Sequence, residues 1–193
     1  MAEKLRTFIG IDPPEKSISE IESVIRELKL KNLLISWTDP TKLHLTLIFL
    51  GNLTQDQVEQ LAKEAEKIGK ANRRFRITPA NFGAFPNLKL PKIIWLGLTG
   101  DLGALENLAK QLKKSAENLA LPVQQERFVP HLTFGKVRRF TNKVERHKVG
   151  EELQRTKIDK FSEIEVDQYT IFKSTPTATG HIHQPLFVIK LSP

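Results

Sequence analysis

The sequence predicts an α+β protein of two lobes, with two mainly antiparallel sheets, helices on their outer faces and a central cleft. Three observations predict this fold. Short strand patterns alternate with amphipathic helix patterns along the whole chain of 193 residues. The order strand, helix, strand, helix occurs twice, and the second strand of each half carries the tripeptide His-Leu-Thr, at 44–46 and 131–133. We therefore expect a pseudo-twofold duplicated fold that forms one domain over residues 1–193, because no linker is long enough to separate independent domains.

Five elements are predicted in the first half: a strand at 7–14, a helix at 17–31, a short strand and turn at 33–42, a strand at 43–51 and a helix at 53–71. The first strand is rich in β-branched and aromatic residues and ends at two prolines. The first helix has Ser17 or Ser19 as its expected N-cap, and the second has Thr54. Both helices carry apolar residues at helical spacing, so each should bury one side.

The second half is predicted to contain strands at 75–87 and 92–100, a helix at 103–120, a strand at 131–139, a helix at 141–159, and strands at 162–175 and 185–193. A loop rich in Pro, Gly and Asn separates the first two strands. Leucines at helical spacing mark the buried side of the helix at 103–120. The segment at 162–175 alternates apolar and polar residues in the manner of one strand.

Composition and charge are those of a globular protein that favours polyanions. Apolar residues make up 39% of the chain and charged residues 27%. There is neither a membrane-spanning apolar run nor a signal-peptide pattern, and the absence of cysteine excludes disulfides and thiolate chemistry. We expect a cytoplasmic monomer with no membrane association. The net charge of +8 favours RNA or DNA as partner, with a plain solubility effect as the alternative.

The repeated tripeptide places an imidazole and a hydroxyl on one face of each strand. Because side chains alternate along a strand, His44 and Thr46 project together, and so do His131 and Thr133. The intervening apolar residues should point into the core. About 0.05 copies of the tripeptide are expected by chance in this composition. A single copy would be compatible with an inert, half-exposed strand face, whereas two copies on matched strands favour a shared function.

Two imidazoles and two hydroxyls that meet across a cleft suit a phosphate diester. The ordinary histidine pKa near 6.5 allows one ring to be neutral and the other protonated at the same pH. The neutral ring can accept a proton from the attacking water, and the protonated ring can donate one to the leaving oxygen. The threonine hydroxyls can donate to the non-bridging oxygens. No metal or other cofactor is needed for these steps, so we expect none.

The same stretches resemble the 2H phosphoesterases, and within them the RNA 2′,3′-cyclic phosphodiesterases, also called 2′-5′ RNA ligases. The hallmark of that family is two His-x-Thr-x motifs, which here are HLTL at 44–47 and HLTF at 131–134. Further stretches similar to the family are TFIGIDPP, LHLTLIFLGNL, AFPNLKLPKIIWLGL, RFVPHLTFGKV and IFKSTPTATGHIHQPL. The resemblance therefore spans nearly the whole chain in the expected order.

The resemblance implies a bilobal fold with the site in the cleft. It implies hydrolysis of RNA 2′,3′-cyclic phosphate ends to 2′-phosphate, with weak 2′-5′ ligation in reverse. By motif position, His44 would be the general acid and His131 the general base, while Thr46 and Thr133 would hold the phosphate. The partners would be single-stranded RNA ends, including ends derived from tRNA.

Four further residues are candidates for substrate binding. The family often has arginine shortly after the second motif, where this chain has Lys136, and often has tyrosine where this chain has His183. Lysine keeps the charge but lacks the two-pronged geometry of arginine. Arg127 precedes the second motif, with a packing role as the alternative. Phe85 lies in the Pro/Gly/Asn-rich loop and is the best candidate to stack on a base, ahead of other aromatics that are expected in the core.

Other histidines and the basic stretch near 140 have simpler interpretations. We expect His181 and His183 in a loop near the substrate, and a zinc site there would need a third ligand. The basic residues at 143–148 are expected on a solvated helix face and, together with those at 136–139, could follow an RNA backbone. Two alternatives stay open for the function: a non-catalytic module that binds RNA ends, and a phosphodiesterase for a small cyclic nucleotide.

Overall fold

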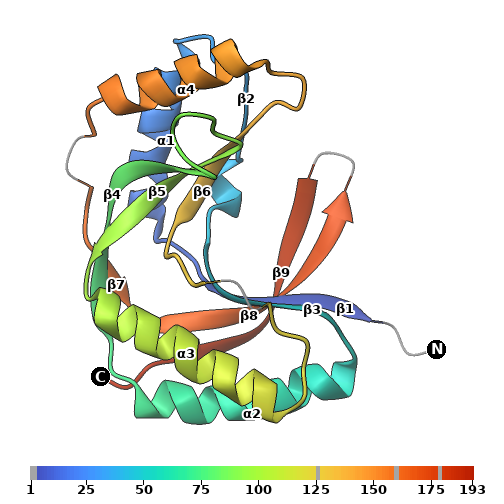
Figure 1. The fold of residues 1–193 in the computed structure, drawn as a ribbon. Coiled ribbons are helices and arrows are strands. Elements are labelled where there is room, and N and C mark those ends of the chain that lie inside the picture. The colour runs from blue at the N-terminus through green and yellow to red at the C-terminus, as the bar shows by residue number, and fades with distance from the viewer. Residues whose placement is uncertain (1–3, 125–126, 159–160, 178–179) are drawn as a thin grey trace.

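The computed structural model describes residues 4–124, 127–158, 161–177 and 180–193 (Figure 1). In chain order its elements are β1 (Leu5–Ile11), α1 (Glu15–Lys29), β2 (Ile35–Trp37), the 3₁₀ turn η1 (Pro40–Lys42), β3 (Leu45–Leu53), α2 (Gln55–Ala71), β4 (Phe75–Phe85), β5 (Ile93–Gly100), α3 (Leu102–Asn118), β6 (Leu132–Val137), α4 (Lys143–Arg155), β7 (Ile164–Val166), β8 (Gln168–Thr177) and β9 (Gly180–Lys190). Within these residues, no helix combines the length and apolar composition needed to cross a bilayer. The predicted α+β class is confirmed.

The strands form two antiparallel groups that meet at one residue pair. One group has the order β7-β4-β5-β6, with β2 also paired to β6, and the other has the order β3-β1-β8-β9. The groups are joined where β3 pairs with β6 at Leu45 and Leu132. Figure 1 shows the two groups at a steep angle to each other, which gives the molecule its two lobes. Four strands of this path lie on each side of the junction, and β2 adds a further strand to one side, so the duplication stays a prediction.

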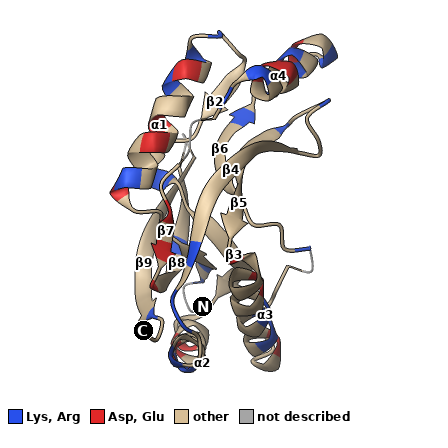
Figure 2. Cartoon of the chain, turned by 90° about the vertical axis from the view of Figure 1, so that its left-hand side faces the viewer, with Lys and Arg blue, Asp and Glu red and all other residues tan. Residues whose placement is uncertain are grey.

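Each lobe takes one helix from each half of the chain. Figures 1 and 2 show α1 and α4 beside the β4-β5-β6 group, and α2 and α3 beside the β3-β1-β8 group. The strand β1 thus lies in one lobe while the following helix α1 lies in the other, and the same holds for β5 and α3. Local contacts agree, since Glu20 on α1 accepts hydrogen bonds from Ser162 near β7, and the Tyr169 hydroxyl on β8 donates to the carbonyl of Ala65 on α2 at 2.6 Å. A single domain over 1–193 stays a prediction, and this exchange of helices supports it.

Helix ends follow the predicted chemistry in one case and depart from it in another. The Thr54 side chain accepts from the backbone N–H of Gln57, and the Gln57 side chain accepts from the N–H of Thr54, which completes a capping box. The predicted caps of α1 are wrong. That helix begins two residues before Ser17, with Pro14 at the N-cap position. The Pro14 carbonyl accepts from the N–H of Ile18 at 3.1 Å, and Ser17 is buried inside the first turn.

The segment predicted as one strand at 162–175 is two strands in different lobes. The strand β7 pairs with β4, whereas β8 pairs with β1 and β9. The chain changes lobes at Asp167, whose carbonyl accepts from the N–H of Leu191 at 2.7 Å. The alternation of apolar and polar residues is broken at this change, because Asp167 and Gln168 are two successive polar residues, and the prediction of one continuous strand is therefore wrong. The C-terminal strand β9 also begins earlier than predicted, at Gly180.

Candidate active site

Both histidines of the repeated tripeptide are held by the same local hydrogen bond. Each lies immediately before its strand, and its Nδ1 contacts the carbonyl oxygen two residues earlier. The distances are 2.9 Å from His44 to Lys42 and 2.7 Å from His131 to Val129. Because a carbonyl can only accept, Nδ1 carries the proton and donates it. In the neutral ring, Nε2 is then the nitrogen that can accept a proton from a substrate.

The junction of the two lobes is formed by the centres of the two tripeptides. Leu45 and Leu132 pair directly, and each is 1% exposed on the core side. Continuing this antiparallel register by one residue places His44 beside Thr133 and His131 beside Thr46. All four polar side chains are half-buried and share the face opposite to the leucines. The structure therefore brings together the four residues that the sequence singles out for chemistry.

Burial lowers the pKa of both imidazoles. For His44 the largest cause is desolvation, and the charge of a protonated His131 lowers the pKa further, against the opposing effect of the hydrogen bond to Lys42. For His131 desolvation again dominates and the hydrogen bond to Val129 opposes it. Since a proton on His131 disfavours a proton on His44, the pair disfavours the state in which both rings are charged. Acid–base catalysis by two histidines requires a state in which only one ring is charged.

Aromatic side chains surround His131. The ring of Phe85 lies 5.1 Å from the imidazole, edge to face, and the indole of Trp95 lies 5.7 Å away. Trp95 lies over Gly83 on the neighbouring strand, where a Cβ atom would collide with the indole ring. Gly83 is thus needed for the close approach of Trp95. The Trp95 Nε1 is buried and has no hydrogen-bond partner among the described residues.

On the other side, His44 borders a pocket of roughly 400 Å³. Its ring lies 5.0 Å from Phe8 and 4.8 Å from His183. The pocket is lined by the segment at 41–44, by Phe8 and Asp12 at the first strand, and by residues of β8 and β9. Phe8 was not singled out by the sequence, because an aromatic residue on an apolar strand is normally core. Only its position in the folded sheet reveals its contact with His44.

The sequence of this chain is similar to curated proteins named RNA 2′,3′-cyclic phosphodiesterase. One from Aquifex aeolicus is 33% identical over 181 residues, which is 93% of each chain. One from Thermotoga maritima is 30% identical over 183 residues, 95% of this chain and 94% of the relative. The family model "LigT like Phosphoesterase" matches residues 11–95. The chain belongs to the LigT-like 2H phosphoesterase family.

Solved structures confirm the fold of this LigT-like phosphoesterase. The apo structure of Escherichia coli LigT superimposes with a TM-score of 0.77 at 21% identity, over the whole of both chains. A protein from Thermus thermophilus gives 0.76 at 20% identity, over 97% of this chain and 98% of its own. The family membership predicted from the two His-x-Thr-x motifs is confirmed by the family model and the curated relatives.

In this LigT-like chain, His183 belongs to a strand, contrary to the loop expected for it. It lies on β9 opposite Ser174 of β8, and His181 lies opposite Pro176. Burial, together with the nearby His44, His181, Lys42 and Arg6, lowers the pKa of His183 to about 4. Its Nδ1 is buried without a hydrogen-bond partner among the described residues. At neutral pH, His183 is therefore an uncharged ring packed against His44.

Lys136 reaches the face of the site because of an irregularity in β6. Strict alternation would place Lys136 with the buried Leu132 and Phe134. However, Ile94 pairs with Gly135 and Trp95 with Thr133, so β6 has one extra residue at this point. Beyond this bulge Lys136 pairs with Ile93 and is exposed on the face of Thr133. Arg127 is exposed in the segment that leads into β6, and the contacts of the described residues do not tie it to the site.

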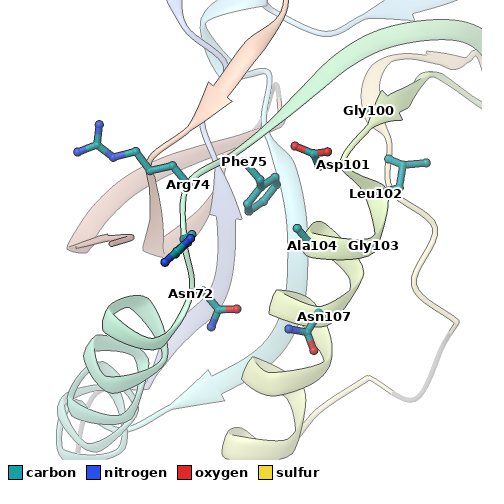
Figure 3. Close-up of a pocket in the computed structure, with 10 residues that line it drawn as sticks. Asn72, Arg74, Phe75, Gly100, Asp101, Leu102, Gly103, Ala104 and Asn107 are labelled. Atoms are coloured by element: carbon teal, nitrogen blue, oxygen red, sulfur yellow. The ribbon is translucent and has the colours of Figure 1, made fainter. Parts of the chain in front are cut away.

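A larger pocket, of about 580 Å³, lies away from the histidines (Figure 3). It is found between the start of β4 and the start of α3, and Asn72, Phe75 and Asn107 are among its lining residues. The Asp101 carboxylate there already accepts from the N–H of Arg76 at 3.0 Å, and Figure 3 shows Arg74 directed outward. Among the residues that the structure describes, no imidazole borders this pocket. The acid–base groups therefore assign the chemistry to the smaller pocket and the lobe junction.

Proposed function

We propose that this LigT-like chain hydrolyses RNA 2′,3′-cyclic phosphate ends to 2′-phosphate ends without a metal ion. The observation that carries the proposal is the pairing of Leu45 with Leu132, which gathers two imidazole–hydroxyl couples around one point. The Aquifex aeolicus and Thermotoga maritima relatives are both named for this activity. The surplus of positive charge in the chain favours a polyanionic substrate.

In the proposed reaction, His131 is the general base and His44 is the general acid. As water attacks phosphorus, its proton passes to Nε2 of His131 and the new P–O bond forms. The P–O3′ bond breaks, and the departing O3′ takes the proton of His44. The product is a 2′-phosphate with a free 3′-hydroxyl, and a second proton exchange with solvent resets both rings.

The threonines and the pocket beside His44 supply binding and charge stabilisation. The hydroxyls of Thr46 and Thr133 donate to the non-bridging oxygens, whose charge grows as phosphorus becomes five-coordinate. The pocket offers room for the terminal nucleoside, which carries the leaving O3′. This location favours His44 as the acid, because the acid must stand next to the leaving oxygen. The bound phosphate's negative charge also opposes the effect of burial and raises the pKa of His44.

Four side chains complete the proposed substrate site. Lys136 supplies a positive charge near the phosphate from the strand that follows His131. Phe85 packs at the ring of His131 and offers an apolar wall, while His183 does the same for His44. Arg127, in the exposed segment before β6, attracts the RNA backbone by its positive charge as the RNA enters the site. Weak 2′-5′ ligation follows if a 5′-hydroxyl takes the place of the attacking water, and bulk water keeps this reaction slow.

The test is incubation of an oligonucleotide carrying a 2′,3′-cyclic phosphate with the protein in the presence of EDTA. We expect full turnover and a 2′-phosphate product, identified by comparison with synthetic oligonucleotides that end in a 2′-phosphate or a 3′-phosphate. A 3′-phosphate product, or loss of activity with EDTA, would contradict the proposal. Binding without turnover would instead support a non-catalytic module for RNA ends. Parallel turnover of a mononucleoside 2′,3′-cyclic phosphate measures how much of the specificity depends on the RNA chain.

A further inference from the structure

Three segments distant in sequence form one surface at the end of the β6 lobe, here called the tip surface. They are residues 29–34, 87–92 and 136–148. The N–H of Arg138 donates to the carbonyl of Leu34, and the N–H of Val137 donates to that of Lys92, both at 2.9 Å. The Arg146 guanidinium donates to the carbonyl of Pro91 at 3.4 Å. Figure 1 shows these segments together at the top of the molecule, next to β2 and α4.

The tip surface concentrates positive charge. Its 25 residues hold ten of the 30 lysines and arginines of the chain, but only one of the 22 acidic residues. The acidic residue is Glu145, and its carboxylate is engaged by the N–H of Asn142 at the start of α4. Figure 2 shows blue segments at this end of the molecule. The ten cations are Lys29, Lys31, Lys89, Lys92, Lys136, Arg138, Arg139, Lys143, Arg146 and Lys148.

Four large apolar side chains of the tip surface are exposed to solvent among these charges. Phe140 is 100% exposed, Leu30 81%, Val144 79% and Leu90 40%. These four are half of the eight large apolar residues exposed in the part of the chain that the structure describes. Phe140 directly follows Arg138 and Arg139 in the sequence. An aromatic ring beside cations is the arrangement with which proteins grip single-stranded nucleic acids, since the ring stacks on a base while the cations follow the phosphates.

We propose that the tip surface binds the single-stranded body of the RNA whose end is processed at the histidines. This inference rests on the proposed function and adds a second, separate contact. His131 and Phe140 are nine residues apart in the sequence, so the chain can separate them by at most about 30 Å. At about 3.4 Å for each stacked nucleotide, this span corresponds to about nine nucleotides. Lys136, which belongs to the tip surface, lies on the face of Thr133 and continues the positive charge toward the histidines.

The experiment compares a short and a long substrate with the same cyclic end. Oligonucleotides of roughly four and sixteen nucleotides fall below and beyond the span to the tip surface. We expect the long RNA to have a KM about tenfold lower in the native protein. The variant Arg138→Gln/Arg139→Gln/Lys143→Gln, combined with Phe140→Ser, should lose this advantage and keep its kcat and KM for the short RNA. All four side chains are exposed, so the fold should be retained.

A matched control changes three exposed lysines on the opposite lobe, with Lys63→Gln, Lys110→Gln and Lys114→Gln on α2 and α3. It removes the same charge and should keep the length dependence. The slope of log Kd for the long RNA against log salt should fall by about 2 in the tip variant, for three lost phosphate contacts. Equal KM for both RNAs in the native protein, or equal losses in the tip variant and the control, would overturn the proposal.

Binding of a sixteen-nucleotide RNA with an ordinary 3′-hydroxyl, followed by fluorescence anisotropy, separates this proposal from the proposed function. If RNA binding depends on the tip residues but no cyclic phosphate is hydrolysed, the proposal for the tip surface is supported and the proposed enzymatic function is wrong. If turnover occurs but the tip variant binds as tightly as the native protein, only the tip proposal fails. A different result would assign the tip surface to membranes and overturn the proposal. In that case the native protein sediments with phosphatidylglycerol vesicles, Phe140→Ser abolishes this sedimentation, and KM does not depend on the length of the RNA.

Discussion

The surroundings of His44 and His131 differ far more than the histidines themselves. Both rings donate from Nδ1 to the carbonyl two residues earlier, and both adjoin the leucine through which the two strands pair. Yet His44 adjoins a pocket with Phe8 and His183, whereas Phe85 and Trp95 flank His131. The fold thus holds two histidines by the same hydrogen bond and places each in a different setting. The setting, rather than the motif, can distinguish an acid from a base.

Removing either imidazole should have the largest effect and should test whether the two have different tasks. For His44→Ala and for His131→Ala we expect kcat to fall about 10³-fold, because each loses a proton-transfer group. The native kcat/KM should follow a bell-shaped pH profile centred below about 6.5, since burial lowers the pKa of both rings.

The two variants should differ in which limb of this profile they lose. Loss of the acid, His44→Ala, should remove the fall in rate at high pH, and loss of the base, His131→Ala, should remove the fall at low pH. Far-ultraviolet circular dichroism should show native folding for both. If both variants lost the same limb, the division into acid and base would be wrong.

Removing the hydroxyl of either threonine compares how the two halves of the chain bind the phosphate. Thr46→Val and Thr133→Val keep the side-chain shape and remove only the hydroxyl. We expect each to lower kcat by about 10²-fold with a smaller change in KM, because the hydrogen bonds strengthen as charge grows on the phosphate oxygens. Single-turnover kinetics measure this directly. Matching losses would show that both halves hold the phosphate equally, and a loss confined to one variant would assign the oxygen contacts to a single lobe.

Strand alternation explains why the four central residues were predictable from the sequence. The exposure pattern at 43–47 and 132–134 follows the alternation of the two strands residue by residue. The orientation of Lys136 was not predictable, because the bulge that turns it arises from pairing with β5. The position of Phe8 at the site was also not predictable, because Phe8 reaches His44 only through the placement of β1 between β3 and β8. Sequence patterns indicate which residues share a face, but long-range pairing decides which face meets which.

Beside His44 lies His183, whereas the described rings beside His131 are Phe85 and Trp95, and this difference should appear as a dependence of stability on pH. Its pKa is about 4 in the fold, below the ordinary 6.5, so the folded state binds fewer protons than the unfolded chain between these values. Its contribution to stability is complete above about pH 6.5 and is lost as the pH falls toward about 4. The full shift would correspond to roughly 3 kcal/mol, and partial exposure of the ring reduces this to about 1 kcal/mol.

Urea denaturation at about pH 7 and about pH 4.5 measures this contribution. The native protein should lose about 1 kcal/mol more between these pH values than His183→Gln, because the variant lacks the buried imidazole. Identical pH dependence of His183→Gln and the native protein would mean that the ring is not held neutral by its surroundings.

The smallest expected effect concerns the fifth residue after each histidine, where the two motifs diverge. The position holds Phe49 after His44 and Lys136 after His131. Phe49 is 41% exposed and lies 5.8 Å from the ring of Phe8, whereas Lys136 offers an exposed charge on the site face of β6. For Lys136→Gln we expect KM to rise about fivefold with kcat nearly unchanged, because a single solvated charge contributes modestly to phosphate binding. Lys136→Arg should bind at least as well as the native protein, since guanidinium can contact two phosphate oxygens at once.

Phe49→Gln provides the matched variant in the other motif. It should leave the salt dependence of KM unchanged, whereas Lys136→Gln should weaken that dependence by about one phosphate contact. A set of KM values between low and high salt distinguishes the two. If both glutamine variants altered the salt dependence equally, the charge at 136 would not be specific to the second motif. The two lobes would then contact the phosphate backbone symmetrically, and the asymmetry of the site would be confined to the pocket beside His44.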